Sequence, residues 1–294
     1  MFTRLKTEKQ RLILHGGSGC DWNRHFNNLK PLYFVHISDT HLGPTAVYKD
    51  RHNVAPYKCA EKLVDIINNL ETTPDFVIHT GDVVYDPDPA AFELAAELFS
   101  RLNVPIYYVN GNHDGKGQLA NYLPMGPKTD LSDDPNTLSY AFEVKGERFV
   151  VVDARGSEEI DPQGLFSEAQ LDVIRAEAQS DGSPLTIFMH YPALPMNSGW
   201  MDANMLVQNG RSFHNLLLPA KERLRGVFHG HVHQNMQVMR DGIFYASIVS
   251  AYSQFYAWPN DEYVQHNFAH EPGYGFVHLL PDQMIVHQHT FERP

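Results

Sequence analysis

Six apolar runs, rich in β-branched and aromatic residues, recur along the chain, and each is followed by polar residues. They cover residues 32–38, 75–81, 105–111, 148–154, 185–191 and 226–232. Near-continuous apolar runs of this length are typical of strands that are buried on both faces of a sheet. We therefore predict one strand at each run.

Between these runs, apolar residues repeat with the i, i+3, i+4, i+7 spacing of an amphipathic helix. One such set is Leu63, Ile66, Ile67 and Leu70, and another is Ala95, Leu98, Phe99 and Leu102. The sequence "SEAQ" at residues 167–170 has the spacing of a capping box, which predicts a third helix starting there. Alternating strands and helices indicate an α/β core with parallel strands.

Antiparallel strands are also expected. Two strand-like runs flank "KGE" within residues 137–154, which predicts a hairpin, and residues 234–294 are rich in strand-like runs separated by turns. The fold class is therefore mixed, α/β with α+β character. Residues 31–294 are interpreted as a single domain, and the weakly patterned residues 1–30 as an N-terminal extension.

Composition restricts the classes of function. The 294 residues carry a formal net charge of -12, which disfavours binding to a nucleic-acid duplex because such binders present a basic face. Two cysteines, Cys20 and Cys59, cannot form a disulfide framework. Neither a signal sequence nor a membrane span is apparent, so we expect a cytoplasmic protein without a membrane partner, and a homo-oligomer is compatible with the sequence.

Polar side chains suited to chemistry follow five of the predicted strands. They are Asp39 and His41, Asp82, the run Asn112, His113 and Asp114, then His190, and finally His231 and His233. Each alone has an ordinary explanation as a turn former, a helix cap or a structural histidine. Together they predict one site, because the loops at the carboxyl ends of strands converge.

The last of these pieces is "FHGHVH", residues 228–233. His231 and His233 are expected to point to the same side, since alternate residues of an extended chain do so. His229 lies earlier in the strand and is interpreted either as a structural residue or as one that supports the ligands.

Carboxylate, amide and imidazole ligands without a thiolate favour Mn, Fe, Zn, Co or Ni. There are seven candidate ligands, which are enough for two ions if one carboxylate bridges them. Two divalent cations opposite two aspartates leave an excess of positive charge, which suits an anionic substrate and a metal-bound hydroxide.

The blocks "DTH", "GD", "GNHD", "H" and "GHVH", in this order over residues 39–233, resemble the calcineurin-like metallophosphoesterase superfamily. The stretches 79–114 and 189–202 resemble its class III cyclic-nucleotide phosphodiesterase and glycerophosphodiesterase branch, although that branch commonly has a second histidine where this chain has Tyr191. The resemblance implies the metallophosphoesterase fold, a four-layer α/β/β/α sandwich of two mixed β-sheets flanked by helices.

The resemblance also implies the roles of the site residues. Two metal ions, Mn, Fe or Zn, would be bound. The first would be held by Asp39, His41, Asp82 and His233, and the second by Asp82, Asn112, His190 and His231, with Asp82 bridging. His113 would not bind metal but would protonate the leaving oxygen or stabilise its charge.

Three more residues are expected to support the ligands or to contact the substrate: Tyr85, Asp114 and His229. A tyrosine at the position of Tyr85 binds ferric iron in purple acid phosphatases, but those enzymes lack the histidine that His41 supplies here. We therefore predict that Tyr85 does not bind the metal. Further candidates for substrate contact are residues 51–53, 197–202 and 250–258.

The predicted function is hydrolysis of a small phosphodiester, such as a cyclic nucleotide or a glycerophosphodiester, by attack of a metal-bound hydroxide. One alternative is a phosphomonoesterase or protein phosphatase of the same superfamily. Another is a metal-binding scaffold without catalytic activity. A nuclease is disfavoured because a polyanionic substrate needs a basic groove.

Overall fold

A computed structural model describes residues 29–180 and 182–294, so the expected extension at residues 1–30 lies outside the described residues except for its last two. All six predicted strands are confirmed, and they belong to two sheets. The first sheet has the order β12-β11-β1-β2-β3, with β1 Leu32–Ile37, β2 Phe76–His79, β3 Ile106–Tyr108, β11 Gly273–Leu279 and β12 Met284–Thr290.

The second sheet has the order β4-β5-β6-β7-β8-β10-β9. Its strands are β4 Thr129–Asp130, β5 Tyr140–Val144, β6 Glu147–Val151, β7 Leu185–Phe188, β8 Leu224–His229, β9 Gln237–Arg240 and β10 Ile243–Ser247. Strands β6, β7, β8 and β10 run parallel, whereas β4, β5 and β9 pair antiparallel. The hairpin between β5 and β6 is confirmed, and both sheets are mixed, as expected.

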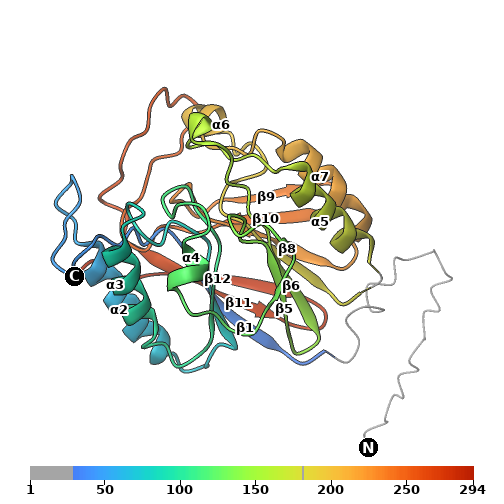
Figure 1. Cartoon of the computed structure of the whole chain (residues 1–294), viewed down its shortest axis with the longest axis horizontal. Helices are drawn as coiled ribbons and strands as arrows, with labels where there is room; N and C mark the ends of the chain where they lie inside the picture. Colours follow the sequence, from blue (N-terminus) through green and yellow to red (C-terminus); the bar gives the residue numbers. More distant parts are fainter. Residues whose placement is uncertain (1–28, 181) are drawn as a thin grey trace, which may run out of the picture.

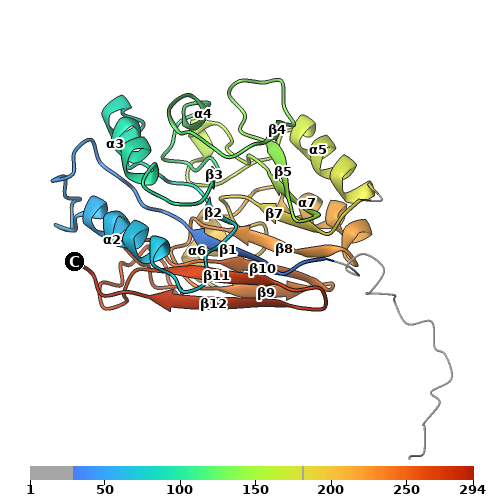
Figure 2. The same cartoon turned by 90° about the horizontal axis from the view of Figure 1, so that it is seen from below.

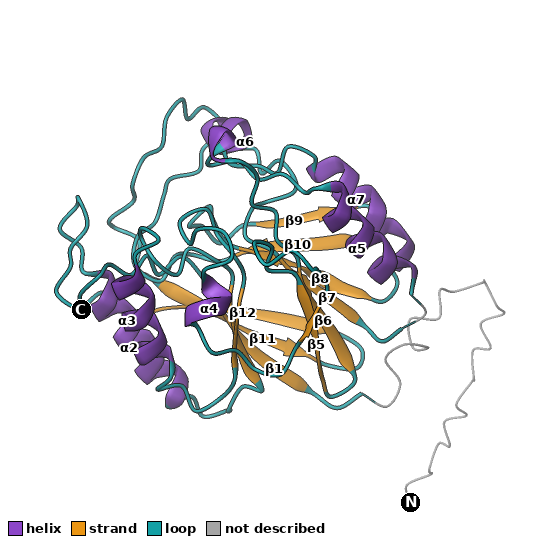
Figure 3. Ribbon diagram, in the orientation of Figure 1, coloured by secondary structure: helices purple, strands orange, loops and turns teal. Residues whose placement is uncertain are grey.

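Helices cover the outer sides of the two sheets. Figures 1 and 2 show α2 (Pro56–Asn68) and α3 (Pro89–Phe99) on one side of the strands, and α5 (Glu168–Gln179) and α7 (Gly210–Leu217) on the other. This is the four-layer α/β/β/α arrangement, and Figure 3 shows the strands enclosed between the two groups of helices.

The three predicted helices are confirmed as α2, α3 and α5, and α5 has both hydrogen bonds of the predicted capping box at Ser167. Helices α4 (Leu119–Tyr122), α6 (Gly199–Asn204) and α7 were not predicted from the sequence. Helices α4 and α6 are shorter than two full periods of apolar spacing, and the eight residues of α7 barely exceed two periods. The remaining helical segments are the 3₁₀ turns η1 (Glu158–Ile160) and η2 (Leu218–Ala220).

Aromatic side chains join the inner faces of the two sheets. Phe34 of β1 packs against Phe149, Phe188 and Phe228 of the second sheet, with ring centroids 6.3, 5.6 and 5.4 Å away. Because this layer fixes the two sheets against each other, it also fixes the loops that follow their strands. No helix among the described residues is long and apolar enough to cross a membrane.

Candidate metal centre

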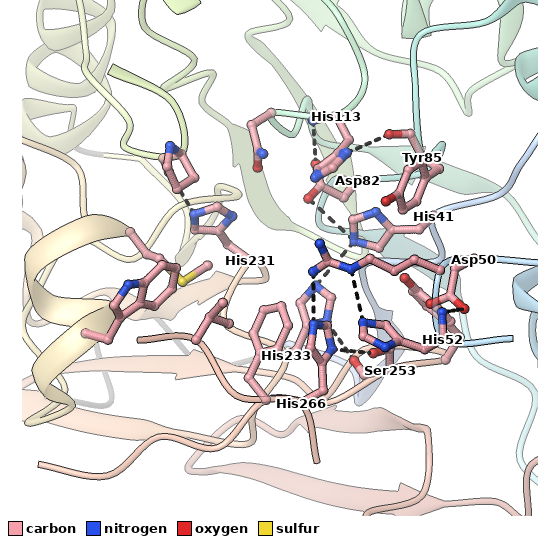
Figure 4. Close-up of a pocket in the computed structure, with 18 residues that line it drawn as sticks. His41, Asp50, His52, Asp82, Tyr85, His113, His231, His233, Ser253 and His266 are labelled. Atoms are coloured by element: carbon pink, nitrogen blue, oxygen red, sulfur yellow. Dashed lines mark hydrogen bonds and ion pairs between the residues drawn. The ribbon is translucent and has the colours of Figure 1, made fainter. Parts of the chain in front are cut away.

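Side chains from both sheets meet at the loops that follow β1, β2, β3, β7 and β8. In one group, a carboxylate oxygen of Asp39 lies 3.3 Å from His233 Nε2, which lies 3.3 Å from His41 Nε2. In a second group, His190 Nε2 lies 3.2 Å from the side-chain oxygen of Asn112, and His231 lies close enough to share an ion with His190. Figure 4 shows His231, His233 and His41 around the same cavity.

Asp82 lies between the two groups. Its Oδ2 atom is 3.7 Å from His41 Nε2 in the first group and 3.4 Å from His190 Nε2 in the second. Its other oxygen accepts the backbone N–H of His113 at 2.9 Å. The structure thus brings together all seven residues that the sequence nominated as ligands, and it gives Asp82 the position that a bridging carboxylate requires.

Three of the histidines have their outward-facing nitrogen fixed by a backbone carbonyl. His190 Nδ1 is 2.7 Å from the Thr80 oxygen, His233 Nδ1 is 2.6 Å from the Ser253 oxygen, and His231 Nε2 is 2.9 Å from the Pro162 oxygen. A carbonyl only accepts, so each outward nitrogen carries a proton, and the inward nitrogen is the one that can bind a cation once it is deprotonated. This is the arrangement that orients histidine ligands at metal sites.

The backbone at these positions is unusual. Among the described residues, nine that are not glycine have positive φ, and five of them are candidate ligands: Asp39 (56°), His41 (45°), Asp82 (54°), His231 (73°) and His233 (48°). Left-handed backbone is unfavourable for residues with a Cβ and concentrates at functional sites. The expected reason for the convergence of His231 and His233 is therefore wrong: β8 ends at His229, and left-handed turns rather than strand periodicity direct both rings inward.

Two glycines allow the loops to approach this closely. A Cβ at Gly111 would overlap a carboxylate oxygen of Asp82, and one at Gly230 would overlap the Ser38 hydroxyl and lie 2.8 Å from Asp39 Oδ2. These glycines explain the sequence blocks "GNHD" and "GHVH" in steric terms, because only a residue without a side chain fits there.

The centre attracts positive charge. Burial by itself favours the neutral ring of His190, but Asp82 and Asp39 outweigh burial and raise the pKa of His190 to about 9. Burial also opposes ionisation of Asp39, yet His233 lowers the pKa of Asp39 below its ordinary value. Two ionised carboxylates inside a ring of inward-facing imidazole nitrogens fit divalent cations of the Mn, Fe and Zn type.

His113 lies beside the two groups, close enough to His41 and Asp82 for these three residues to share an ion. Its Nδ1 is 2.6 Å from the carbonyl oxygen of Tyr85, so that nitrogen donates and Nε2 is available to the cavity. Burial disfavours its charged form, but the Asp82 carboxylate and the Tyr85 carbonyl together raise the pKa of His113 above its ordinary value. The Tyr85 ring lines the cavity, 6.1 Å from the His41 ring between centroids.

Asp114 supports the loops from behind. Its two carboxylate oxygens accept four backbone N–H groups, at 2.7 to 3.1 Å, from Asp82, Val83, Val84 and Gly111. Asp114 was expected either to support the ligands or to contact the substrate. It is fully buried, and its hydrogen bonds hold the loops of Asp82 and Asn112 together.

His229 and Tyr191 are also buried. His229 Nδ1 is 3.2 Å from the Gly230 carbonyl, and His229 belongs to neither ligand group. The Tyr191 ring, at the position where the related branch commonly has a histidine, packs against His190 and His231 with centroids 4.9 and 5.0 Å away.

The cavity extends from the centre toward several predicted substrate contacts. Arg51, His52, Trp200, Ser253 and Phe255 line it, as expected from the segments nominated in the sequence. His266 and Val264 also line the cavity, but the sequence did not nominate them. Sequence patterns contain little that predicts this role for His266, because it is distant in sequence from every ligand block and only the fold brings it to the cavity.

Comparisons with known proteins agree with this geometry. The family model of calcineurin-like phosphoesterases matches residues 32–235. A protein of Psychrobacter arcticus named "Probable cyclic nucleotide phosphodiesterase" is 26% identical over 263 residues, covering 86% of this chain and 91% of that protein. A "Glycerophosphodiester phosphodiesterase GpdQ" of Enterobacter lignolyticus is 28% identical over 211 residues, covering 69% of this chain and 71% of that protein.

Solved structures share the fold at lower sequence identity. A dimetal phosphatase from Danio rerio superposes with a TM-score of 0.60 at 15% identity, covering 89% of this chain and 99% of that chain. A purple acid phosphatase from yellow lupin superposes with a TM-score of 0.62 at 13% identity, covering 89% of this chain and 52% of that chain. The chain therefore belongs to the metal-dependent calcineurin-like phosphoesterases, in the branch of the proteins named for cyclic-nucleotide and glycerophosphodiester hydrolysis, and it is a hydrolase that acts on phosphoric ester bonds.

Proposed function

We propose that the protein is a binuclear metal-dependent phosphodiesterase that hydrolyses a small diester, such as a cyclic nucleotide or a glycerophosphodiester. One observation carries this proposal: Asp82 lies between two groups of inward-facing side chains, and His113 lies beside them with its Nδ1 held by the Tyr85 carbonyl. The names of the relatives from Psychrobacter arcticus and Enterobacter lignolyticus support a diester as the substrate.

In this proposal, each cation has four ligands from the chain. The first site consists of Asp39, His41, Asp82 and His233, and the second of Asp82, Asn112, His190 and His231. When bound, two cations would neutralise phosphoryl oxygens and make a water acidic enough to act as a nucleophile near neutral pH. The chain contributes the preset lone pairs of its histidines and the rigid left-handed loops that carry them.

His113 is proposed as the general acid. Its Nδ1 proton is committed to the Tyr85 carbonyl, so the proton to be donated resides on Nε2, which faces the cavity. The Asp82 carboxylate favours the protonated ring, which places an acid beside the oxygen that leaves when the ester bond breaks. Tyr85 is proposed to position His113 through that carbonyl and to stay outside the metal ligands.

The test combines metal content with two kinds of diester. Protein loaded with Mn, Zn or Fe is expected to cleave bis-p-nitrophenyl phosphate and 3′,5′-cyclic AMP. Asp82→Ala is expected to bind fewer than two ions and to lose both activities. His113→Ala is expected to keep two ions and to lose cyclic AMP hydrolysis by roughly 10²–10⁴-fold, with a smaller effect on p-nitrophenolate release, which needs little protonation.

His278→Ala is the matched control, because His278 lies in β11 and does not line the cavity. Cleavage of monoesters alone would reject the diesterase proposal in favour of a phosphomonoesterase or protein phosphatase. Two bound ions without cleavage of any ester would instead support a metal-binding scaffold.

A further inference from the structure

The outer part of the cavity carries a single basic side chain of the Lys/Arg type. Of the described residues that line the cavity, only Arg51 has a side chain that is positively charged at every physiological pH. The net charge of the chain is -12, so the protein as a whole repels anions, and Arg51 supplies a local positive charge in the cavity.

The loop that carries Arg51 is built to hold it. The carboxylate of Asp50, which is buried, accepts the backbone N–H groups of His52 at 2.9 Å and Val54 at 2.8 Å. Asn53, at a φ of 63°, donates its N–H to the Asp50 carbonyl. Asp50 thus stabilises the turn, and it makes no ion pair with Arg51.

The guanidinium of Arg51 contacts imidazoles instead of carboxylates. Its Nε donates to His52 Nε2 at 3.1 Å, and its Nη2 lies 3.2 Å from His266 Nε2. Burial, His52 and Arg51 lower the pKa of His266 to about 4, so this ring is neutral and accepts from Arg51. Figure 4 shows His52 and His266 side by side next to His233.

The charge of Arg51 is therefore not neutralised by the protein. Within residues 29–180 and 182–294, no carboxylate lies within 4 Å of it, and the two imidazoles take only part of its five N–H donors. The remaining donors are available to a ligand, and a guanidinium matches the planar oxygens of a carboxylate or phosphate.

Apolar side chains line part of the cavity, although Asp50, Tyr252 and Ser253 line it as well. Trp200, Met205, Phe255 and Val264 line it, and the Phe255 ring stacks on His233 with centroids 4.3 Å apart. A ligand bound at the metal centre thus has both apolar side chains and the Arg51 cation within the same cavity. This arrangement suits a short organic arm that ends in an anionic group.

We propose that Arg51, flanked by His52 and His266, is a specificity-determining residue that binds a second anionic group, a carboxylate or a phosphate, on the arm of a diester whose scissile phosphate lies at the metal centre. This inference rests on the proposed function. Since the arm does not react, the contact is the same in the ground state and in the transition state, so it lowers KM and leaves kcat unchanged.

The test uses three chromogenic diesters with the same leaving group. They are the ethyl, 2-carboxyethyl and 2-phosphoethyl esters of p-nitrophenyl phosphate, hydrolysed by the Mn-loaded protein. The wild type is expected to prefer the two anionic arms, and the two arms separate carboxylate from phosphate recognition. Arg51→Gln is expected to raise KM for the preferred arm about tenfold, with kcat and the ethyl ester unchanged within about twofold.

Two further variants sharpen the result. Arg51→Lys is expected to restore part of the preference, because it keeps the charge and loses the fork of donors. Arg175→Gln removes an arginine from α5 that does not line the cavity, and it is expected to change nothing. An equal loss for all three esters in Arg51→Gln, or no preference in the wild type, would overturn the proposal.

A binding measurement separates this inference from the proposed function. Calorimetry compares 3-phosphonopropionate with propylphosphonate, which differ only in the terminal carboxylate. If the wild type cleaves no diester, the proposed function fails, and a preference for 3-phosphonopropionate that disappears in Arg51→Gln still supports the anion contact. Equal affinity of the wild type for the two phosphonates refutes a contact with a carboxylate. If the kinetic comparison also shows no preference for the 2-phosphoethyl arm, the anion contact is refuted altogether.

Discussion

Gly230 tests whether the close packing of the loops is what places the ligands. In Gly230→Ala, the new Cβ would overlap Ser38 Oγ and would lie 2.8 Å from Asp39 Oδ2 and 2.9 Å from the Thr80 oxygen. Nonbonded heavy atoms pack at about 3.5 Å, so the Asp39 carboxylate must move by roughly 0.7 Å. The substitution therefore perturbs both the packing and one proposed ligand.

The two effects have different expected magnitudes. Overpacking of this kind costs about 1–3 kcal/mol in the free energy of unfolding. A displaced ligand is expected to weaken Mn²⁺ binding by about 10–100-fold. Ser38→Ala separates them, because Ser38 Oγ is buried and has no hydrogen-bond partner among the described residues, so its removal leaves no polar group unsatisfied. In Gly230→Ala with Ser38→Ala, stability is expected to recover in part while the metal affinity stays low.

Urea unfolding in EDTA, followed by tryptophan fluorescence, measures the stability, and the electron paramagnetic resonance signal of free Mn²⁺ measures binding. Gly242→Ala is the control: its φ is 86° and no atom lies within 4 Å of the new Cβ. It is expected to cost about 1 kcal/mol from backbone strain and to leave Mn²⁺ affinity unchanged. Wild-type Mn²⁺ affinity in Gly230→Ala would refute the reasoning, because Asp39 would then have tolerated the Cβ without moving.

Two further predictions concern buried charges. Glu147 pairs with Arg225 through two contacts of 2.6 and 3.1 Å, and Glu147→Gln, which removes the negative charge of this buried pair, is expected to cost about 3–5 kcal/mol in urea unfolding. Glu143→Gln, on an exposed side chain of the same hairpin, is expected to cost less than about 0.5 kcal/mol, and equal costs would contradict the argument. Burial and the charge of His229 lower the pKa of His36 to about 3 in the folded protein, whereas the pKa in the unfolded chain is about 6.5. The contribution of His36 to the free energy of unfolding is therefore fully present above about pH 6.5, and it is lost as the pH falls below that value. Between pH 7.5 and 5.5 the metal-free wild type is expected to lose about 1.4 kcal/mol more than His36→Gln, and parallel losses would disprove the assignment.

Much of the site could be predicted from the sequence because the ligand blocks are local. Asp39 and His41 follow one apolar run directly, and Asp82 follows another, so recognising the runs also locates the ligands. The strands themselves follow from β-branched and aromatic runs, a signal that depends on no distant residue. The Ser167 capping box was equally local, and the predicted helix start is observed.

Other features depended on distant partners. Thr80, Ser253 and Pro162 fix the tautomers of the histidines through backbone carbonyls, which no side-chain pattern reveals. His266 reaches Arg51 from 215 positions away along the chain. Such contacts are set by how the loops fold over the sheets, and local propensity does not encode them.

The sequence by itself determined which residues carry the chemistry and the order in which they occur, because each block places ligand-type residues directly after an apolar strand, and the blocks "GD", "GNHD" and "GHVH" add glycines that permit tight turns. Tertiary structure alone decided that the blocks meet across two sheets, with Asp39 and Asp82 from one and His190 from the other. It also decided how His231 and His233 point, since left-handed backbone is unfavourable locally and is maintained only by the packing around it. The physical reason is that strand and turn preferences act over a few residues. The position of Asp82 between the two ligand groups instead results from the packing of two sheets through Phe34 and its aromatic neighbours.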